Sequence, residues 1–285
     1  CYYGAQTQRA FDNFQISSKK IPRSMIAAIA MIKRSAAIVN NNLNFIDTKI
    51  KDAIVKACDE VIQGKFDDQF IVDIYQTGSG TSSNMNANEV IANRACEILG
   101  GNKGDKKLVH PNDHVNYGQS SNDVIPTSIH IATSLEIDKR LLPELKHLKI
   151  SIDKKTDEFK DIIKIGRTHL QDATPITLGQ EFSGYSKMIE NSIKRIKNDL
   201  PFLLKLAQGG TAVGTGINTH KDFGKLVAYE LSEITGLNFT ESDNHFESQA
   251  TQDSVVHLSG SLKTLSVSLY KIANDIRWLG SGPRS

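Results

Sequence analysis

Residues 178–203 read LGQEFSGYSKMIENSIKRIKNDLPFL, and this stretch decides the fold. Its apolar residues recur at spacings of three and four, as one face of an α-helix requires. A single helix of this length gains most of its stability by packing against other helices. The stretch therefore predicts a long helix inside a helical bundle, with an apolar stripe made of Phe182, Tyr185, Ile189, Ile193, Ile196, Leu200 and Leu203.

Two more stripes extend this pattern. One runs from Leu258 to Leu279, and a less regular one runs from Ile125 to Ile152, where Pro143 is expected to kink or interrupt the helix. The preceding residues indicate shorter helices, at about 22–40, 48–63 and 83–99, separated by polar loops. We therefore predict an all-α protein with a small N-terminal helical domain, residues 1–118, and a bundle of long helices, residues 119–285.

Composition narrows the class of partner. The chain has 34 basic and 32 acidic residues, without the basic excess typical of a nucleic-acid-binding protein. Its longest strongly apolar run, residues 25–32, is far shorter than the roughly 20 residues of a membrane-spanning helix. Cys58 lies on an apolar stripe, which suits a reduced structural thiol in a reducing compartment. From its first and last residues, we expect this sequence to be a piece of a longer protein.

Four polar segments, here called the polar islands, interrupt the helices at 78–86, 110–114, 119–123 and 165–175. Serine, threonine and asparagine at helix starts cap backbone N–H groups, so a structural role accounts for some of them. Hydroxyls and amides beside a helix N-terminus also form an anion site. For each island taken alone, both interpretations stay open.

Two other segments fit familiar motifs poorly. His110 and His114 are four residues apart, but Pro111 would break a helical metal site, so no metal is predicted. The glycine run 209–216 lacks the lysine of a phosphate-binding loop, and no strand precedes it. A helix end and a tight turn, where backbones approach closely, explain this run better.

Taken together, the islands offer many neutral donors, helix starts, and few histidines that titrate near neutral pH. Such a site suits a small dianion, because amides and helix dipoles can hold its carboxylates while an imidazole moves a proton.

The same segments resemble the class II, iron-independent fumarases of the fumarase/aspartase superfamily. The resemblance implies a lyase of the tricarboxylic acid cycle that interconverts fumarate and L-malate by adding or removing water, with no metal or organic cofactor. The matching motifs appear in order as GAQTQR at 4–9, TGSGT at 77–81, NMNANEV at 84–90, HPND at 110–113, QSSND at 119–123, GRTHLQDATP at 166–175 and GGTAVGTG at 209–216.

The resemblance also implies site residues. His169 is similar to the family's proton-transfer histidine, which acts directly or through an activated water. The remaining residues implied for the substrate pocket are Ser79, Gly80, Thr81, Ser120, Ser121, Asn122 and Thr168. The residues implied for a secondary dicarboxylate site are His110, Pro111, Asn112 and Asp113.

The resemblance further implies a homotetramer whose active sites are each shared among three subunits. It puts a mobile catalytic serine and a substrate-binding lysine in a segment beyond Ser285, so we predict that these 285 residues alone lack hydratase activity. The expected location is the cytoplasm, or the mitochondrial matrix in a eukaryote.

Two alternatives remain. Aspartate ammonia-lyase shares the fold, but its pattern usually has Gln where this chain has His169, and THLQ and HPND both favour fumarase. Argininosuccinate and adenylosuccinate lyases differ more in these segments. A non-catalytic helical scaffold would tolerate apolar or charged residues in the islands, so the intact islands argue against it.

Overall fold

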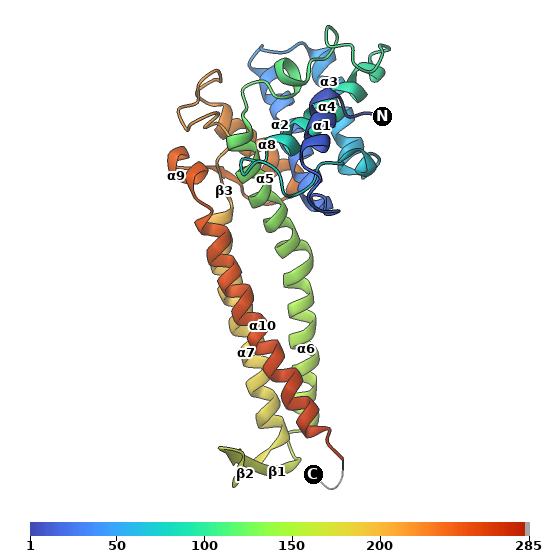
Figure 1. Cartoon of the computed structure of the whole chain (residues 1–285). Helices are drawn as coiled ribbons and strands as arrows, with labels where there is room; N and C mark the ends of the chain where they lie inside the picture. The colour runs from blue at the N-terminus through green and yellow to red at the C-terminus, as the bar shows by residue number, and fades with distance from the viewer. Residues whose placement is uncertain (283–285) are drawn as a thin grey trace. The chain divides into compact units, whose positions relative to one another are not determined.

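The computed structural model describes residues 1–282 (Figure 1). The chain folds into two compact units: unit 1 comprises Cys1–Ser134 with Leu203–Gln252, and unit 2 comprises Leu135–Phe202 with the segment from Asp253 onward. Helices dominate both units, which confirms the predicted all-α class. The predicted division at residue 118 is not decided by this grouping and stays a prediction. Within residues 1–282, no helix is both long enough and apolar enough to cross a membrane.

Unit 1 is built around α2 (Arg23–Asn42), which is buried on most of its sides and contacts α3, α4 and α8. Small side chains such as Ala28, Ala36 and Ala37 are fully or almost fully buried and let these helices approach closely. The other elements are α1 (Ala5–Asn13), α3 (Thr48–Ile62), η1 (Asp67–Gln69), α4 (Thr81–Ile98), η2 (Pro111–Val115), most of α5 (Ser121–Glu136), β3 (Lys205–Leu206), α8 (Phe223–Thr235), β4 (Thr240–Glu241) and α9 (His245–Ala250).

The predicted helices of this unit agree with α2, α3 and α4 to within two residues at each end. Cys58 lies in the core of α3 with no exposed surface, as its apolar stripe predicts, and burial raises the pKa of its thiol.

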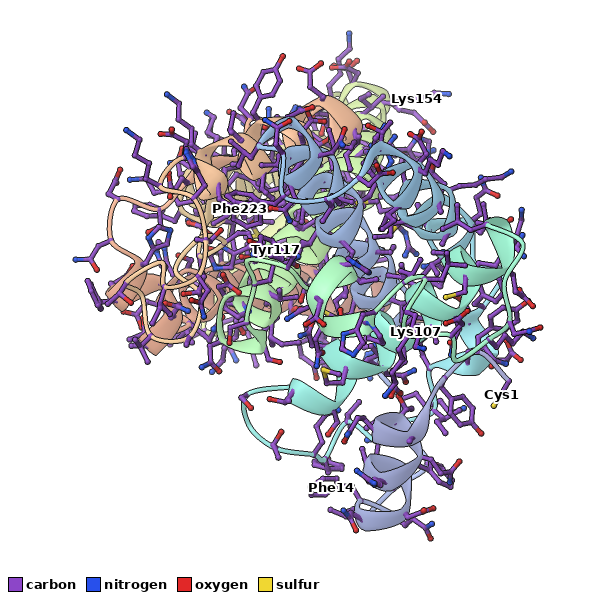
Figure 2. The ribbon with its side chains drawn as sticks, turned by 90° about the horizontal axis from the view of Figure 1, so that it is seen from above. Cys1, Phe14, Lys107, Tyr117, Lys154 and Phe223 are labelled. Carbon is purple, nitrogen blue, oxygen red and sulfur yellow. The ribbon has the colours of Figure 1, made fainter. Side chains whose placement is uncertain are left out.

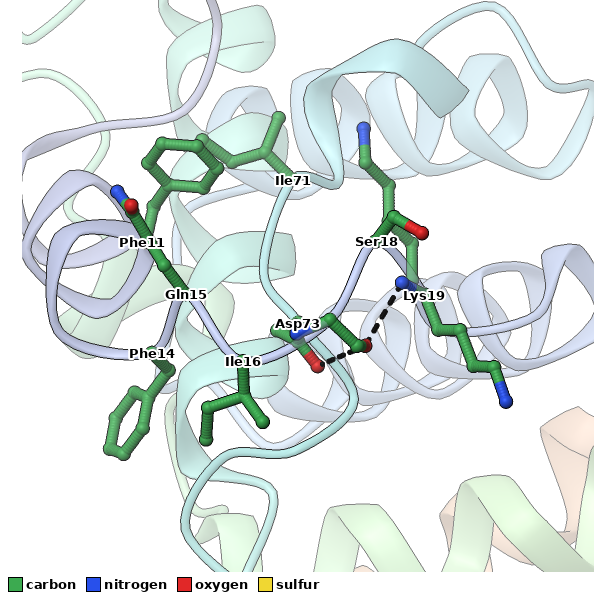
Figure 3. A pocket seen from close by; sticks show the side chains of 10 residues that line it. Phe11, Phe14, Gln15, Ile16, Ser18, Lys19, Ile71 and Asp73 are labelled. Atoms are coloured by element: carbon green, nitrogen blue, oxygen red, sulfur yellow. Dashed lines mark hydrogen bonds between the residues drawn. The ribbon is translucent and has the colours of Figure 1, made fainter.

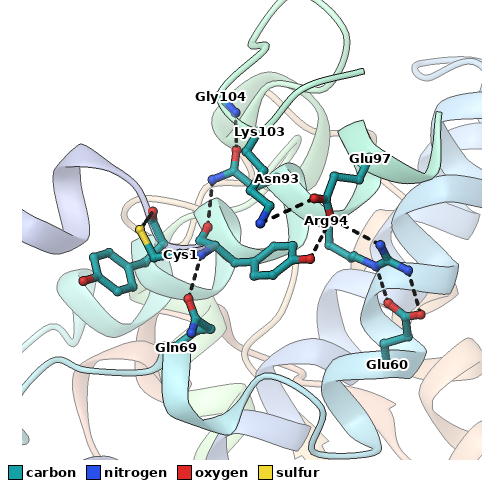
Figure 4. A network of polar contacts seen from close by, with 10 residues as sticks. Cys1, Glu60, Gln69, Asn93, Arg94, Glu97, Lys103 and Gly104 are labelled. Carbon is teal, nitrogen blue, oxygen red and sulfur yellow. Dashed lines mark hydrogen bonds and ion pairs between the residues drawn. The ribbon is translucent and has the colours of Figure 1, made fainter. Parts of the chain in front are cut away.

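The first residues of the chain are tied to α4 by a polar network (Figure 4). The Tyr2 ring lies 4.6 Å from the Phe66 ring and 3.8 Å from Lys103 Nζ, and its hydroxyl donates to Glu97 Oε2 at 2.7 Å. The Arg94 guanidinium joins this network because it donates to both Glu97 and Glu60. Bidentate pairing of this kind fixes the orientation of the guanidinium plane.

A single carboxylate holds the beginning of α1. Glu89 of α4 is 7% exposed, and it accepts hydrogen bonds from the backbone N–H groups of Gly4, Gln6 and Thr7 at 2.8–3.0 Å. The Thr7 hydroxyl adds a fourth donor at 2.6 Å. A negative charge at a helix N-terminus satisfies donors that have no partner inside the helix.

Unit 2 contains the long helices predicted from the apolar stripes: α6 (Leu142–Glu158), α7 (Leu178–Leu203) and α10 (Asp253–Leu279). Helix α7 runs beside both others (Figure 1), since Ser186 is hydrogen-bonded to Asp153 of α6 and Tyr185 Oη donates to Asp275 of α10 at 3.0 Å. Ile189 and Ile196 of its stripe are fully buried.

The predicted interruption before Pro143 is also present. A π-helical turn, η3 (Ile137–Leu141), separates α5 from α6, and Pro143 lies in the first turn of α6. Helix α6 follows η3 without a break in helical conformation, and the proline has no N–H to donate to the carbonyls of that preceding turn. The interruption therefore follows from proline chemistry.

Candidate active site

The first and third polar islands meet inside unit 1. Asn84 of α4 is fully buried, and its Nδ2 donates to Ser121 Oγ at 3.1 Å and to Asn116 Oδ1 at 3.3 Å. The backbone of Gly80 comes close to α5, because a Cβ at this position would lie 2.8 Å from Cγ1 of Ile125. Segments 79–84 and 120–125 therefore lie together.

The N-terminus of α5 carries the residues implied for carboxylate binding. Ser120 Oγ accepts from Asn122 N at 3.3 Å, so Ser120 caps the helix. This leaves Ser121 Oγ facing Asn84. Ser120 and Ser121 are half-buried and Asn122 is exposed, which suits donors at the edge of a binding site.

The glycine run joins this cluster through Asp123, which is fully buried. The Asp123 carboxylate accepts from the backbone N–H groups of Gly209 at 3.2 Å and Thr211 at 2.9 Å, and from Ser120 N at 2.9 Å. Asn122 Nδ2 also donates to Ala212 O at 2.7 Å. Burial raises the pKa of Asp123 to about 6, while the backbone donors act to lower it.

Close approach of backbones explains Gly209, as the sequence predicts for this run, and close approach of side chains explains Gly118. Gly209 has φ +107°, and a Cβ there would lie 2.8 Å from Cα of Gly224. A Cβ at Gly118 would lie 2.7 Å from Thr219 Oγ1 and 3.8 Å from the ring of Phe223; Phe223 and the adjacent Tyr117 are labelled in Figure 2. The loop between β3 and α8 and the loop before α5 are therefore packed together.

Ser79 and Gly80 form the turn before α4, and Thr81 is the first residue of that helix. Ser79 Oγ and Thr81 Oγ1 are 2.9 Å apart, both residues are exposed, and Gly80 has φ +66° at the N-cap position. The two hydroxyls therefore lie together at a helix N-terminus, next to Ile125 of α5.

The second island forms the short π-helix η2. His110 Nδ1 accepts from Asn112 N at 3.3 Å and Asp113 N at 3.2 Å, and it lies 3.1 Å from Asp113 Oδ2. His114 Nδ1 accepts from His110 N at 2.8 Å, and burial lowers the pKa of His114. Among residues 1–282, no group of three or more His, Cys, Asp or Glu could hold a metal ion.

The fourth island belongs to unit 2 and forms a β-hairpin, which was not predicted from the sequence. Strand β1 (Ile163–Thr168) pairs antiparallel with β2 (Gln171–Thr177), with an irregularity between Ile165 and Arg167. Arg167 Nε lies 3.2 Å from Asp172 Oδ1, so these two residues support the hairpin.

The tip of the hairpin has an unusual backbone. His169 has φ +49° and Leu170 has φ +64°, the signs required of both central residues in a two-residue type I′ turn. Asparagine and glycine normally fill these positions, because other side chains are strained there. Thr168 and His169 are exposed, and unlike Ser79–Thr81 and Ser120–Asn122 they belong to unit 2.

Sequence reasoning missed one residue near the cluster. Lys33 of α2 has no exposed surface, and its Nζ donates to Asn116 Oδ1 at 2.7 Å and Gln119 Oε1 at 3.0 Å. A signal was available, because Lys33 is four residues from both Ile29 and Ala37 and therefore shares their buried face.

A sequence model of a lyase family matches residues 1–285. The chain belongs to this lyase family. Among its relatives, class II fumarate hydratase of Methylorubrum extorquens is 55% identical over 284 residues, covering 100% of this chain and 60% of the relative. Mitochondrial fumarate hydratase of Saccharomyces cerevisiae is 56% identical, covering 99% of this chain and 58% of the relative. This lyase chain thus spans about 60% of the length of the curated relatives it matches.

Solved structures agree with the family assignment. A crystal structure of class II fumarase from Schistosoma mansoni has a TM-score of 0.97 and 42% identity, covering 99% of this chain and 62% of that chain. A fumarate lyase:delta crystallin structure from Brucella melitensis, bound to cobalt, has a TM-score of 0.94 and 43% identity, covering 100% of this chain and 62% of that chain.

The lyase chain also has a pocket of about 480 Å³ between the α1–α2 loop and the segment around Asp73 (Figure 3). Phe11, Phe14 and Ile16 line it together with Lys19. None of the predicted site residues lines this pocket, and Asp73 is bound to Ser17 and Tyr75 within the same loops.

Proposed function

We propose that the whole protein reversibly hydrates fumarate to L-malate. The observation that carries this proposal is the hydrogen-bonded cluster at the N-terminus of α5, where segments 79–84, 120–123 and 209–212 meet. This cluster occurs in a chain that is 55% identical to a relative named fumarate hydratase. The cluster also offers neutral hydrogen-bond donors, which suit a small dicarboxylate and support the proposed function.

The chemistry accounts for these residue types. Removing a carbon-bound proton beside a carboxylate builds negative charge on that carboxylate, and preorganised donors stabilise this charge in the transition state. We assign this task to the hydroxyls of Ser120 and Ser121 and the Asn122 amide, at the positive end of α5. Ser79 and Thr81, with the backbone of Gly80, complete the substrate-binding loop.

We assign proton transfer to His169, supported by Thr168. Its imidazole is exposed at the tip of the hairpin, and the turn that presents it is strained. Strained backbone of this kind clusters at functional sites. Loss of hydroxide from malate needs a second group on the opposite face of the substrate, which we place outside these 285 residues.

We propose a homotetramer in which three subunits contribute residues to each active site. Helix α10 buries Leu258, Leu265 and Ile272 within unit 2, at intervals of seven residues. Its other faces expose large apolar side chains, which is typical of a helix that packs against other subunits. These exposed residues are Val256, Val267, Tyr270 and Trp278.

We further propose that His110, Pro111, Asn112 and Asp113 form a secondary dicarboxylate site. The exposed amide of Asn112 supports this assignment. Relatives named from bacteria and from yeast mitochondria support a location in the cytoplasm or the mitochondrial matrix.

The test follows the ultraviolet absorbance of fumarate's conjugated double bond with the whole protein, with and without ammonia. Loss of absorbance without ammonia is expected for a hydratase. Loss only with ammonia would instead indicate an aspartate ammonia-lyase, and no change under either condition would favour a non-catalytic scaffold.

A further inference from the structure

Lys33 is a charged residue in a place where charge is costly. It lies on α2 among Ile29, Ile32 and Ala36, and all four side chains have no exposed surface. Removing an ammonium group from water costs several kcal/mol unless partners replace its hydration. A methionine of similar length would fill the same volume without this cost, so packing alone does not explain the lysine.

The partners of Lys33 are two side-chain amides that flank one short segment. Nζ donates to Asn116 Oδ1 at 2.7 Å and to Gln119 Oε1 at 3.0 Å. An ammonium group can only donate, so it forces both amides to turn their oxygen atoms inward. Their NH₂ groups then donate to the main chain, from Asn116 to Gln119 O and from Gln119 to Val115 O and Tyr117 O.

The two amides connect Lys33 to the residues that we propose bind the substrate. Asn116 Oδ1 also accepts from Asn84 Nδ2, which in turn donates to Ser121 Oγ. Gln119 immediately precedes Ser120 in the chain. Lys33 is thus connected to the Ser120–Asn122 segment both through the backbone and through Asn84.

A buried carboxylate of the same cluster compensates the charge. Asp123 of α5 favours the protonated form of Lys33, and Lys33 favours the ionised form of Asp123. Burial opposes both effects and lowers the pKa of Lys33 to about 7. Cys58 of α3 is the other titratable group that acts on Lys33.

We propose that Lys33 is a positioning residue, which fixes the Asn116–Gln119 segment and thereby sets the donors of Ser120, Ser121 and Asn122 for the substrate carboxylate. This inference rests on the proposed function. It predicts that loss of Lys33 both weakens substrate binding and slows turnover, because the displaced donors hold the substrate carboxylate and stabilise the charge that builds on it in the transition state.

The experiment compares Lys33→Met with Arg34→Met in the whole protein. Arg34 is the next residue of α2 and pairs instead with Asp59 of α3 at 2.8 Å, so it controls for the loss of a neighbouring cation. Amide hydrogen exchange over residues 116–124 is expected to be about tenfold faster in Lys33→Met and unchanged in Arg34→Met. Unchanged exchange in Lys33→Met would overturn the positioning role.

Kinetics supply the readout that a purely structural role would not produce. Lys33→Met is expected to raise KM for fumarate about tenfold and to lower kcat about tenfold, because the same donors hold the substrate carboxylate and stabilise its added charge. A KM equal to that of the wild type would contradict the proposal. If Lys33→Met does not fold, Gln119→Leu takes its place, since it removes one hydrogen-bond acceptor of Lys33. Gln119→Leu is then expected to give the same kinetic changes, and wild-type kinetics in this variant would overturn the proposal.

The pH dependence of KM adds a second signature. In the wild type and in Arg34→Met, KM is expected to rise as pH increases above about 7, where Lys33 loses its proton. This rise should be absent from Lys33→Met, and its persistence there would contradict the role of Lys33. If the wild-type protein does not hydrate fumarate at all, the proposed function fails, while the exchange experiment still decides whether Lys33 positions residues 116–124.

Discussion

At the scale of single residues, His169 and Asp123 show how backbone and burial shape the candidate site. His169 occupies a left-handed conformation that asparagine or glycine would adopt with less strain. Asp123 is buried among backbone donors that few other side chains could satisfy. Motif resemblance predicted His169 but not the turn that presents it, because turn geometry depends on the pairing of two strands. Lys33 was missed because lysine is rarely fully buried.

Replacing His169 with Asn is expected to lower kcat about 10²- to 10⁴-fold, as for the loss of a general acid–base group. The helical circular dichroism should stay unchanged, because the side chain is exposed. His147→Asn is the matched control, since His147 is an exposed histidine of the same unit. Unfolding of His169→Asn would show instead that the histidine is structural.

Asp123 makes stability depend on pH. Its folded pKa of about 6 lies above the ordinary value of 3.8, so the folded state holds a proton that the unfolded state releases between these values. Protonated Asp123 therefore stabilises the folded state fully below about pH 4. This contribution to the free energy of unfolding, up to about 3 kcal/mol, is lost as pH rises through about 6. Asp123→Asn should remove this part of the pH dependence of the free energy of unfolding. The exposed Asp138→Asn should retain it, and an identical slope in wild type and Asp123→Asn would contradict the assignment.

At the scale of elements, long periodic helices were predictable and short elements were not. The stripes of α7 and α10 repeat over many turns, so their period is unambiguous. Helices α1, α8 and α9 have fewer turns or lie beside glycine-rich loops, and they were not predicted. The β1–β2 hairpin carries His-Leu at its turn instead of Asn-Gly, so the usual hairpin signal was missing.

Helix α1 depends on one carboxylate of α4. Glu89→Gln should destabilise the protein by about 2–3 kcal/mol, because the new NH₂ group would face backbone N–H donors of Gly4, Gln6 or Thr7. Hydrogen exchange at residues 4–8 should become faster. The control is Glu136→Gln, where a more exposed ion pair with Arg140 is lost at a cost below about 1 kcal/mol. Equal stability of the two variants would contradict this account of α1.

At the scale of the whole molecule, α10 tests the proposed assembly. Val267 is 63% exposed on a helix that already buries a separate apolar face. Val267→Glu should therefore convert tetramers into smaller species in analytical ultracentrifugation, because a charge would be buried without a partner. Lys146→Glu on an exposed position of α6 should leave the tetramer intact. A Val267→Glu variant that still sediments as a tetramer would exclude this face as a subunit contact.

The proposed hydration of fumarate adds one hydrogen to carbon, and the origin of that hydrogen can be measured. Fumarate is incubated with the whole protein in D₂O, and the products are followed by proton NMR. We expect L-malate carrying one deuterium on its methylene carbon, because His169 or a water it activates delivers a single solvent proton there. Fumarate that persists unchanged under these conditions, with the protein folded and assembled, would contradict the account.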